Sequence, residues 1–243
     1  MNNRGPNTKW NRTQPDDGLP NTERWFKVTV QRAADLEPFF VIKALQEQGI
    51  QFVPFNYTTN GNDIVFFVQG DDLTSSIRSM SRRIVTPLGA KLTILTEKSA
   101  LPLIEVTGDF VKKLELVMSK RYDSDSKFLN MANFSTEQDF LSVRLYVSLQ
   151  RINICKEVVK IIIEHIPDVR SINLSNNKIQ SLVPFKPLVD SCKNLKQLDL
   201  SYNNINNIDH LENLAGLGLE TLNIDFNPFK KAMKDQSQDT YVR

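Results

Sequence analysis

The pattern Val169-x-x-Ile172-x-Leu174-x-x-Asn177-x-Ile179 decides the fold, because it occurs three times in the second half of the chain. It returns as Leu195-x-x-Leu198-x-Leu200-x-x-Asn203-x-Ile205 and as Leu219-x-x-Leu222-x-Ile224-x-x-Asn227-x-Phe229. The asparagines are 26 and 24 residues apart, within the range of about 20 to 29 residues that is typical of leucine-rich repeats. In such repeats the apolar positions fill the core and the asparagine hydrogen-bonds backbone groups in the turn after each strand. We therefore predict structural roles for Asn177, Asn203 and Asn227.

The repeats extend in both directions less clearly. Leu129-x-Met131-x-x-Phe134 has the strand spacing of an earlier repeat, with Phe in place of Asn. Before it, an amphipathic helix is predicted to begin at an Asp109 cap, so we place the repeat domain at residues 109–243. Residues 230–243 contain no apolar stripe able to close the stack, and solenoids need polar-faced end caps. The domain is thus predicted to be truncated at its C-terminal end.

The first half of the chain shows a different order of periodicities. Phe26, Val28 and Val30 alternate with polar residues, as in a half-buried strand, and a helical stripe follows that ends at Gly49. The turn Asn60-Gly61-Asn62 separates two β-rich runs, which predicts a hairpin. The remaining elements are a helix capped by Asp71 and Asp72 and a strand at residues 92–95. The order β-α-β-β-α-β predicts an RNA-recognition-motif-like sandwich over residues 24–98.

The fold class predicted for the whole chain is therefore α+β: this sandwich, then a short leucine-rich-repeat solenoid. Residues 99–108 contain Pro102 and Gly108 without sustained periodicity, which indicates a linker. Residues 1–23 are polar apart from Trp10 and are predicted to be a disordered arm. The basic residues of the arm lie mainly in its first half, so it is either a phosphate-contacting tail or a plain solvated leader.

Composition excludes several classes of protein. The net charge of +2 gives no whole-chain signal for a polyanion-coating protein. Cys155 and Cys192 are too few for a disulfide framework or a four-thiolate metal site, and no apolar run approaches the roughly 20 residues of a membrane helix. His165 and His210 are the only histidines, and no nucleotide loop or zinc motif is present. We expect a soluble intracellular protein without catalytic residues, metal or cofactor.

Candidate RNA contacts come from the sandwich topology. Such modules bind single-stranded RNA by stacking bases on aromatic residues of the two central strands. On the predicted open face only Phe67 remains as a stacking platform, and Lys27 takes the place of the first-strand aromatic, so we expect Lys27 to contact phosphate. Further basic residues form either a track for RNA or an ordinary solvated face. They are Arg78, Arg82, Arg83, Lys91, Lys112, Lys113 and Arg121.

Candidate partner contacts come from the repeats. The residues between the apolar positions are predicted to present the concave face of the solenoid, with mixed charge that becomes acidic toward the third repeat. Such a face suits a protein partner better than a polyanion. The residues selected are Arg170, Lys196, Asp199, Tyr202, Asp225 and Phe226.

Four segments together resemble the nuclear RNA export factor (TAP) family. They are Arg24-Trp25-Phe26-Lys27-Val28-Thr29-Val30, Phe66-Phe67-Val68, Ser119-Lys120-Arg121-Tyr122-Asp123 and Ile172-Asn173-Leu174-Ser175-Asn176-Asn177. The resemblance implies a non-standard RNA-recognition domain joined to four leucine-rich repeats, the part of the receptor that holds RNA and adaptor proteins. It implies a location in the nucleus with shuttling to the cytoplasm. Family members continue with domains for a nuclear-transport-factor-like partner and for nucleoporins, and both are missing from these residues.

Two hypotheses follow. The first is an RNA- and adaptor-binding part of an export factor that grips RNA by largely sequence-independent phosphate contacts. The second is a specialised paralogue that acts as a protein-interaction module, recruits a regulatory partner and has little general RNA binding. The near-neutral charge and the mixed concave face motivate the second.

Overall fold

The computed structural model describes residues 23–37 and 39–229. The predicted arm at residues 1–23 therefore lies almost entirely outside the described residues, as does the segment 230–243. The chain divides into two compact units between Pro102 and Leu103, which lie inside the segment predicted as a linker. Ile104 and Val106 of that segment pack against the core of the second unit. Within the described ranges, no helix has the length and apolar character needed to cross a membrane.

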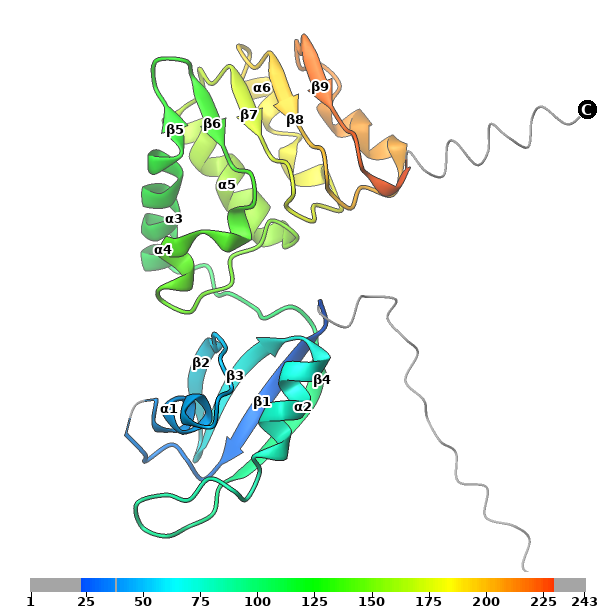
Figure 1. Cartoon of the computed structure of the whole chain (residues 1–243). Coiled ribbons are helices and arrows are strands. Elements are labelled where there is room, and N and C mark those ends of the chain that lie inside the picture. Colours follow the sequence, from blue (N-terminus) through cyan, green and yellow to red (C-terminus); the bar gives the residue numbers. More distant parts are fainter. Residues whose placement is uncertain (1–22, 38, 230–243) are drawn as a thin grey trace, which may run out of the picture. The chain divides into compact units, whose positions relative to one another are not determined.

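The first unit has the predicted order of elements (Figure 1). Its sheet is antiparallel, with strand order β2-β3-β1-β4, so β1 and β3 are the central strands. The sandwich prediction is confirmed. The elements are β1 (Trp25–Gln31), α1 (Phe40–Glu47), β2 (Phe55–Asn60), β3 (Asp63–Gln69), α2 (Asp71–Ser79) and β4 (Thr93–Ser99).

Successive side chains of each strand point to opposite faces of the sheet, so every second side chain packs against the helices. Val28 of β1 pairs with Phe66 of β3, and both are fully buried. Leu45 of α1 and Ile77 of α2 belong to the same apolar cluster, so both helices cover one face of the sheet. β4 runs to Ser99, beyond the predicted end at residue 95, because its polar second half pairs with β1 at the edge of the sheet.

Both predicted aspartate caps are wrong. The residue before α2 is Gly70 with φ 106°, and Asp71 and Asp72 lie in the first turn, where their charge still favours the positive end of the helix dipole. In the second unit, α3 (Gly108–Lys120) is capped by Thr107, whose Oγ1 accepts a hydrogen bond from the Phe110 backbone NH at 3.2 Å. A hydroxyl two residues earlier therefore takes the role expected of Asp109.

The second unit is a curved stack of short strands (Figure 1). Its sheet has the order β5-β6-β7-β8-β9; β5 and β6 are antiparallel and the later neighbours are parallel. The strands are β5 (Tyr122–Asp123), β6 (Phe128–Asn130), β7 (Ser171–Asn173), β8 (Gln197–Asp199) and β9 (Thr221–Asn223). The connecting helices are η1 (Phe134–Thr136), α4 (Gln138–Leu141), α5 (Ile152–His165), η2 (Val183–Phe185), α6 (Leu188–Ser191) and η3 (Ile208–Leu214).

The repeat asparagines are buried and hydrogen-bond backbone groups, as predicted, and they also join successive repeats. Asn203 Oδ1 accepts hydrogen bonds from the backbone NH groups of Asn177 and Ile179, each at 3.0 Å, and its Nδ2 donates to the carbonyl of Leu174 at 2.9 Å. Asn177 makes the same bonds to the degenerate repeat, because its Oδ1 accepts from the Phe134 NH and its Nδ2 donates to the Met131 carbonyl. The early repeat is thus real, with Phe134 fully buried in place of its own asparagine.

Both thiols are buried in the repeat core, where burial raises the pKa of Cys192 and raises the pKa of Cys155 from 9.0 to about 12. The native state therefore favours the protonated thiol of Cys155. The stability that this burial contributes is present below pH 9 and is lost as the pH rises from about 9 toward 12. We expect Cys155 to react with Ellman's reagent at pH 8 at least about 100-fold more slowly in the folded chain than in guanidinium. Rapid reaction of both thiols in the folded chain would contradict this burial.

Candidate RNA and partner interfaces

A hairpin between α2 and β4 carries three of the predicted RNA contacts, Arg82, Arg83 and Lys91. The Arg82 NH donates to the Leu92 carbonyl at 2.7 Å, and the Leu92 NH donates to the Ile84 carbonyl at 3.0 Å. Ile84 and Leu92 are buried in the core, which anchors the hairpin and leaves Arg83 and Lys91 exposed. This geometry fixes the backbone and leaves the charged side chains in water.

The charge on this segment is of one sign. Arg78, at the end of α2, and Arg82, Arg83 and Lys91 are all exposed, and residues 73–92 contain no Asp or Glu. None of the four cations forms an ion pair with a carboxylate of the described residues. We call residues 78–91 the basic hairpin. The basic hairpin carries a local charge of +4, although the net charge of the whole chain is only +2.

Lys27 lies on the face of the first unit's sheet that the helices α1 and α2 do not cover. Its neighbours Phe26 and Val28 point to the helices, so Lys27 faces away from them, and its Nζ lies 3.0 Å from Glu97 Oε1 on β4. The two residues are directly opposite each other in the strand register. The charge of Lys27 is therefore balanced by Glu97, in contrast to the charges of the basic hairpin.

The open face of the sheet holds more aromatic side chains than the sequence indicated. Phe67 lies there, as predicted, and is half-buried; Trp25 and Phe55 share the face, and their ring centroids are 5.6 Å apart. The sequence prediction named Phe67 alone as a stacking platform and did not place these two rings beside it. Trp25 is two residues before Lys27 in the same strand, so the sequence already indicated that both side chains lie on the same face of the sheet. The position of Phe55 depends on a register shift between Phe55 and Thr58 of β2, and no sequence pattern indicates that shift. Trp25 is only 6% exposed, so it offers little surface to a base.

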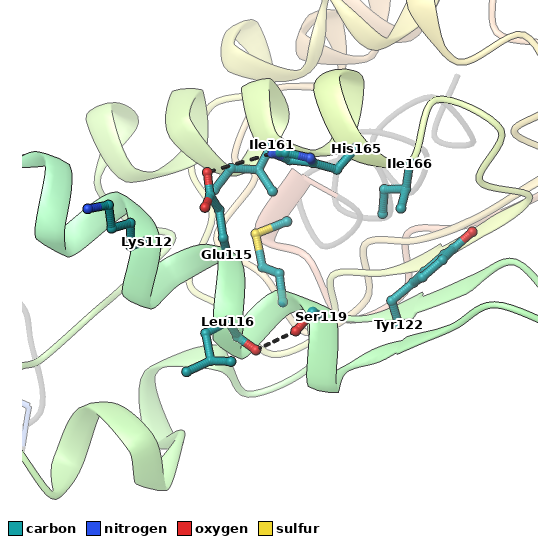
Figure 2. A pocket seen from close by; sticks show the side chains of 9 residues that line it. Lys112, Glu115, Leu116, Ser119, Tyr122, Ile161, His165 and Ile166 are labelled. Carbon is teal, nitrogen blue, oxygen red and sulfur yellow. Dashed lines mark hydrogen bonds and ion pairs between the residues drawn. The ribbon is translucent and has the colours of Figure 1, made fainter.

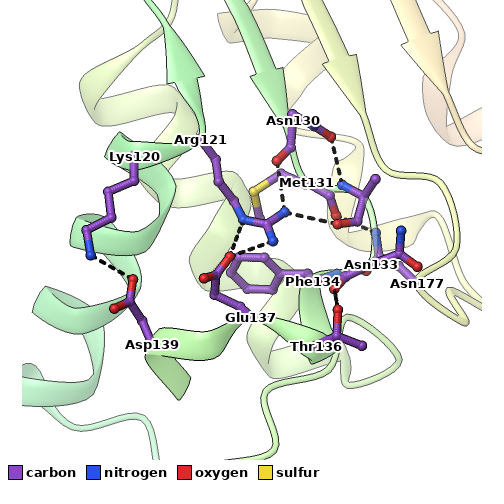
Figure 3. A network of polar contacts seen from close by, with 11 residues as sticks. Lys120, Arg121, Asn130, Met131, Asn133, Phe134, Thr136, Glu137, Asp139 and Asn177 are labelled. Atoms are coloured by element: carbon purple, nitrogen blue, oxygen red, sulfur yellow. Dashed lines mark hydrogen bonds and ion pairs between the residues drawn. The ribbon is translucent and has the colours of Figure 1, made fainter. Parts of the chain in front are cut away.

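Arg121, which was predicted from the sequence to contact RNA, lies in a network of contacts within the second unit. Its Nε donates to Glu137 Oε2 at 2.6 Å, and Nη1 donates to the carbonyls of Asn130 at 3.1 Å and Ala132 at 2.9 Å (Figure 3). The guanidinium also lies 5.5 Å from the centre of the Phe134 ring. These contacts occupy the donors that a phosphate would need and tie the end of α3 to the first repeat.

Lys112 and Lys113 are on α3 of the second unit. Lys112 is exposed at the edge of a groove of about 490 Å³ between α3 and α5, and Lys113 is half-buried (Figure 2). Glu115 Oε1 lies 3.6 Å from His165 Nε2 across this groove. His165 is exposed at the end of α5, as expected for a helix-terminal residue. The groove therefore has charge of both signs along its rim.

The face of the repeat sheet is mainly polar and uncharged. A shallow hollow of about 320 Å³ is lined by strand residues that include Ser171, Asn173, Gln197, Thr221 and Asn223. Asp199 also lines it, but its Oδ1 accepts a hydrogen bond from the Ser201 NH at 2.8 Å and so shapes the turn after β8. The hollow itself offers hydrogen-bonding groups and little charge.

The other predicted partner residues flank the strands. Arg170 and Lys196 precede β7 and β8, and Lys196 Nζ lies 3.6 Å from Glu220 Oε1. Tyr202 and Phe226 follow β8 and β9, and Asp225 precedes Phe226. The predicted set is thus divided between the two ends of the strands.

Tyr202 and Phe226 form a stacked pair, which we call the aromatic pair. Their ring centroids are 4.3 Å apart with 14° between the planes, and the residues are 55% and 68% exposed. Both have left-handed backbone conformations, with φ of 54° and 57°. Asn176 occupies the equivalent position one repeat earlier, also with φ 57°. The alignment of the repeats was a signal for this conformation, since Asn tolerates it better than other non-glycine residues.

Two family models match the chain. The model described as "NXF1/2/3/5 leucine-rich repeat domain" matches residues 119–243, more than half of the chain, and the model described as "Tap, RNA-binding" matches residues 25–103. The chain belongs to the nuclear RNA export factor family. The matches confirm the resemblance and the order of an RNA-binding domain followed by leucine-rich repeats. Members of this family are non-enzymatic RNA-binding adaptors, in agreement with the prediction of no catalytic role.

The chain is also similar to individual proteins. Nuclear RNA export factor 1 of Drosophila melanogaster is 29% identical over 222 residues, which cover 90% of this chain and 33% of the relative. Nuclear RNA export factor 2 of Homo sapiens is 27% identical over 239 residues, which cover 97% of this chain and 38% of the relative. A solved structure of Chaetomium Mex67:Mtr2 subunits matches 53% of this chain and 82% of that chain at 19% identity, with a TM-score of 0.41. The chain spans about a third of the length of these curated relatives.

Proposed function

We propose that these residues are the RNA- and adaptor-binding part of a nuclear RNA export factor, and that the basic hairpin holds RNA by phosphate contacts that are largely independent of sequence. The observation that carries the proposal is the group of four exposed cations without an acidic residue between positions 73 and 92. A local patch of this kind attracts a polyanion even where the whole chain is nearly neutral.

The chemistry of the patch favours phosphate over bases. Three of its four cations are arginines, whose planar guanidinium groups match two phosphate oxygens at once. Base reading uses accessible aromatic rings on the sheet, and there Trp25 is buried and Phe55 and Phe67 are half-buried. Binding is thus expected to depend on salt more than on sequence.

The test is charge reversal on the basic hairpin. We expect Arg82→Glu with Arg83→Glu to weaken binding of a labelled 20-nucleotide single-stranded RNA by about 10- to 100-fold at moderate salt, because two phosphate contacts are replaced by repulsion. The slope of log affinity against log salt should become less steep by about 1.4, or about 0.7 for each lost contact. Fluorescence anisotropy over a salt series, with RNAs of two unrelated sequences, measures both quantities.

A matched control is Lys156→Glu with Lys160→Glu, which changes the net charge equally on exposed positions of α5. It should leave the salt slope unchanged. An equal loss of affinity in both double variants would show that only total charge matters and would refute a local phosphate site. A strong preference for one RNA sequence would contradict sequence independence.

The wider role of the protein belongs to the same proposal. As part of an export factor, the chain is expected in the nucleus with shuttling to the cytoplasm. The full-length protein is expected to bind a nuclear-transport-factor-like partner and nucleoporins through domains other than the two described here. The repeat face is then the surface for adaptor proteins.

A second candidate function is a protein-interaction module with little general RNA binding. It is favoured by the aromatic pair, which is exposed in the turns after β8 and β9, next to a sheet face that is mainly polar and uncharged. If the intact chain binds neither RNA sequence at low salt but binds a protein partner that Tyr202→Asn with Phe226→Asn releases, this second function replaces the first.

A further inference from the structure

The tip of the basic hairpin is apolar, whereas tight turns are usually built from polar residues, glycine and proline. Residues 85–90, which we call the apolar tip, have one polar side chain, that of Thr86, and it is buried. The rest of the apolar tip is exposed, and Leu88, at 95%, is the most exposed large apolar residue that the structure describes. A leucine stabilises a fold by leaving water, so folding does not account for Leu88.

The backbone holds the apolar tip in one arrangement. The Thr86 NH donates to the Ala90 carbonyl at 2.8 Å, and the Gly89 NH donates to the Thr86 carbonyl at 2.9 Å. Thr86 Oγ1 accepts a hydrogen bond from the Ala90 NH at 3.1 Å, which accounts for the inward position of this side chain. Figure 1 shows the loop between α2 and β4 extending beyond the sheet. An ordered tip of this kind loses little conformational freedom when it binds a ligand.

Cations flank the apolar tip along the chain. Arg82 and Arg83 precede it and Lys91 follows it, and residues 73–92 contain no Asp or Glu. The acidic residues of the adjoining strands, helix start and loops are Asp35, Glu37, Asp63, Asp71, Asp72 and Glu97. Asp71 is paired with Arg24 and Glu97 with Lys27, and among the described residues none of the six forms an ion pair with a cation of the hairpin. The tip therefore presents apolar surface next to uncompensated positive charge.

A ligand that fits this surface offers anionic groups and apolar surface close together. Single-stranded RNA does so, because the faces of its unpaired bases lie next to its phosphates. In an RNA duplex the base faces are stacked inside the helix, so the hairpin meets phosphate and ribose alone. Leucine is among the apolar side chains that nucleic-acid-binding proteins insert beside bases. The match of the first unit to the "Tap, RNA-binding" model favours RNA over an anionic membrane, which offers similar chemistry.

We propose that Leu88 contacts the faces of unpaired bases in RNA whose phosphates are held by the neighbouring cations. The hairpin thereby gains affinity for single-stranded RNA that it does not gain for a duplex. The inference rests on the proposed function and adds to it a substrate class and a residue that selects it. Every base has such a face, so the contact agrees with binding that is largely independent of sequence. Because Leu88 is uncharged, its contact adds affinity without adding salt dependence.

The experiment compares three labelled ligands on the full 243-residue chain by fluorescence anisotropy. They are a 20-nucleotide single-stranded RNA, an abasic strand of the same length and charge, and a 20-base-pair RNA duplex. We expect Leu88→Ser to weaken binding of the base-bearing strand about 5-fold and to change the other two affinities by less than about 2-fold. Its salt slope should equal that of the unsubstituted chain. Leu88→Phe, which places an aromatic ring at the tip, should tighten binding of the base-bearing strand about 3-fold.

Two controls separate contact with bases from loss of structure. Val183→Ser changes another exposed apolar residue, at η2 of the second unit, and should leave all three affinities unchanged. Leu88→Ser should keep the melting temperature, since the side chain is exposed. An unchanged affinity of Leu88→Ser for the base-bearing strand, or an equal loss on all three ligands, would overturn the proposal. A Leu88 effect confined to phosphatidylserine vesicles would also overturn it and make the tip a membrane contact.

The charge variant Arg82→Glu with Arg83→Glu distinguishes this inference from the proposed function. It should weaken binding of the base-bearing and abasic strands alike, because both carry the same phosphates. If it does so while Leu88→Ser has no effect, only the contact with bases is refuted. If Leu88→Ser weakens the base-bearing strand while the charge variant binds normally, only the phosphate contacts are refuted.

Discussion

Replacing Asn203 by alanine is expected to lower the free energy of unfolding of the repeat unit by about 3–5 kcal/mol. Asn203 is 2% exposed, and its amide bridges two repeats. The substitution removes an acceptor shared by the NH groups of Asn177 and Ile179 and a donor to the carbonyls of Leu174 and Leu200. Each buried backbone group left without a partner costs about 1–3 kcal/mol, and entry of a water molecule offsets part of the total.

The measurement is urea unfolding of the full chain, followed by circular dichroism and by amide hydrogen exchange at Ile179. The control is Asn204→Ala, which alters the neighbouring exposed asparagine and should change the free energy by less than about 0.5 kcal/mol. If both variants unfold alike, Asn203 does not join the repeats. The exchange rate at Ile179 adds a local check, because its NH loses its only acceptor given by the structure.

The features predicted correctly from sequence are those that repeat locally. The apolar positions of the three clear repeats recur at nearly constant spacing, and Ile172, Leu198 and Leu222 fall in register across three parallel strands. The order of strands and helices along the first unit was predicted in part from the Asn60-Gly61 turn and from the alternation in β1. Such patterns indicate which face of a single helix or strand is buried, and residues close together in the sequence determine that face.

The features that sequence could not reveal depend on distant contacts. Arg121 has the residue type and charge of an RNA contact, but Glu137 reaches it only after the chain has turned through β5, β6 and η1. Lys27 meets Glu97 because β1 and β4 are neighbours in the sheet although 70 residues apart. Charge type was readable in both cases, and the partner that neutralises the charge was not. The cations of the basic hairpin have no acidic residue in their own segment, and their role in RNA binding stays a prediction.

Arg121→Ala is expected to lower the free energy of unfolding of the repeat unit by about 2–3 kcal/mol and to leave RNA affinity unchanged. The variant leaves the carboxylate of Glu137, whose side chain is 19% exposed, without its cation and leaves the carbonyls of Asn130 and Ala132 without a donor. The remaining exposure of the pair keeps the cost below that of a fully buried ion pair. Lys120→Ala is the control, since its pair with Asp139 is more exposed and should contribute less than about 1 kcal/mol.

A double-mutant cycle with Glu137→Gln isolates the ion pair from the carbonyl contacts. We expect a coupling energy of about 1–2 kcal/mol between Arg121 and Glu137, with the rest of the Arg121→Ala effect due to the carbonyls and to the contact with Phe134. Arg121→Lys should recover only part of the stability, because one ammonium cannot reach the carboxylate and both carbonyls in the fork that the guanidinium makes. RNA affinity decides the assignment: if Arg121→Ala weakens RNA binding as much as a basic-hairpin variant does while stability stays unchanged, Arg121 belongs to the RNA site and its network is incidental.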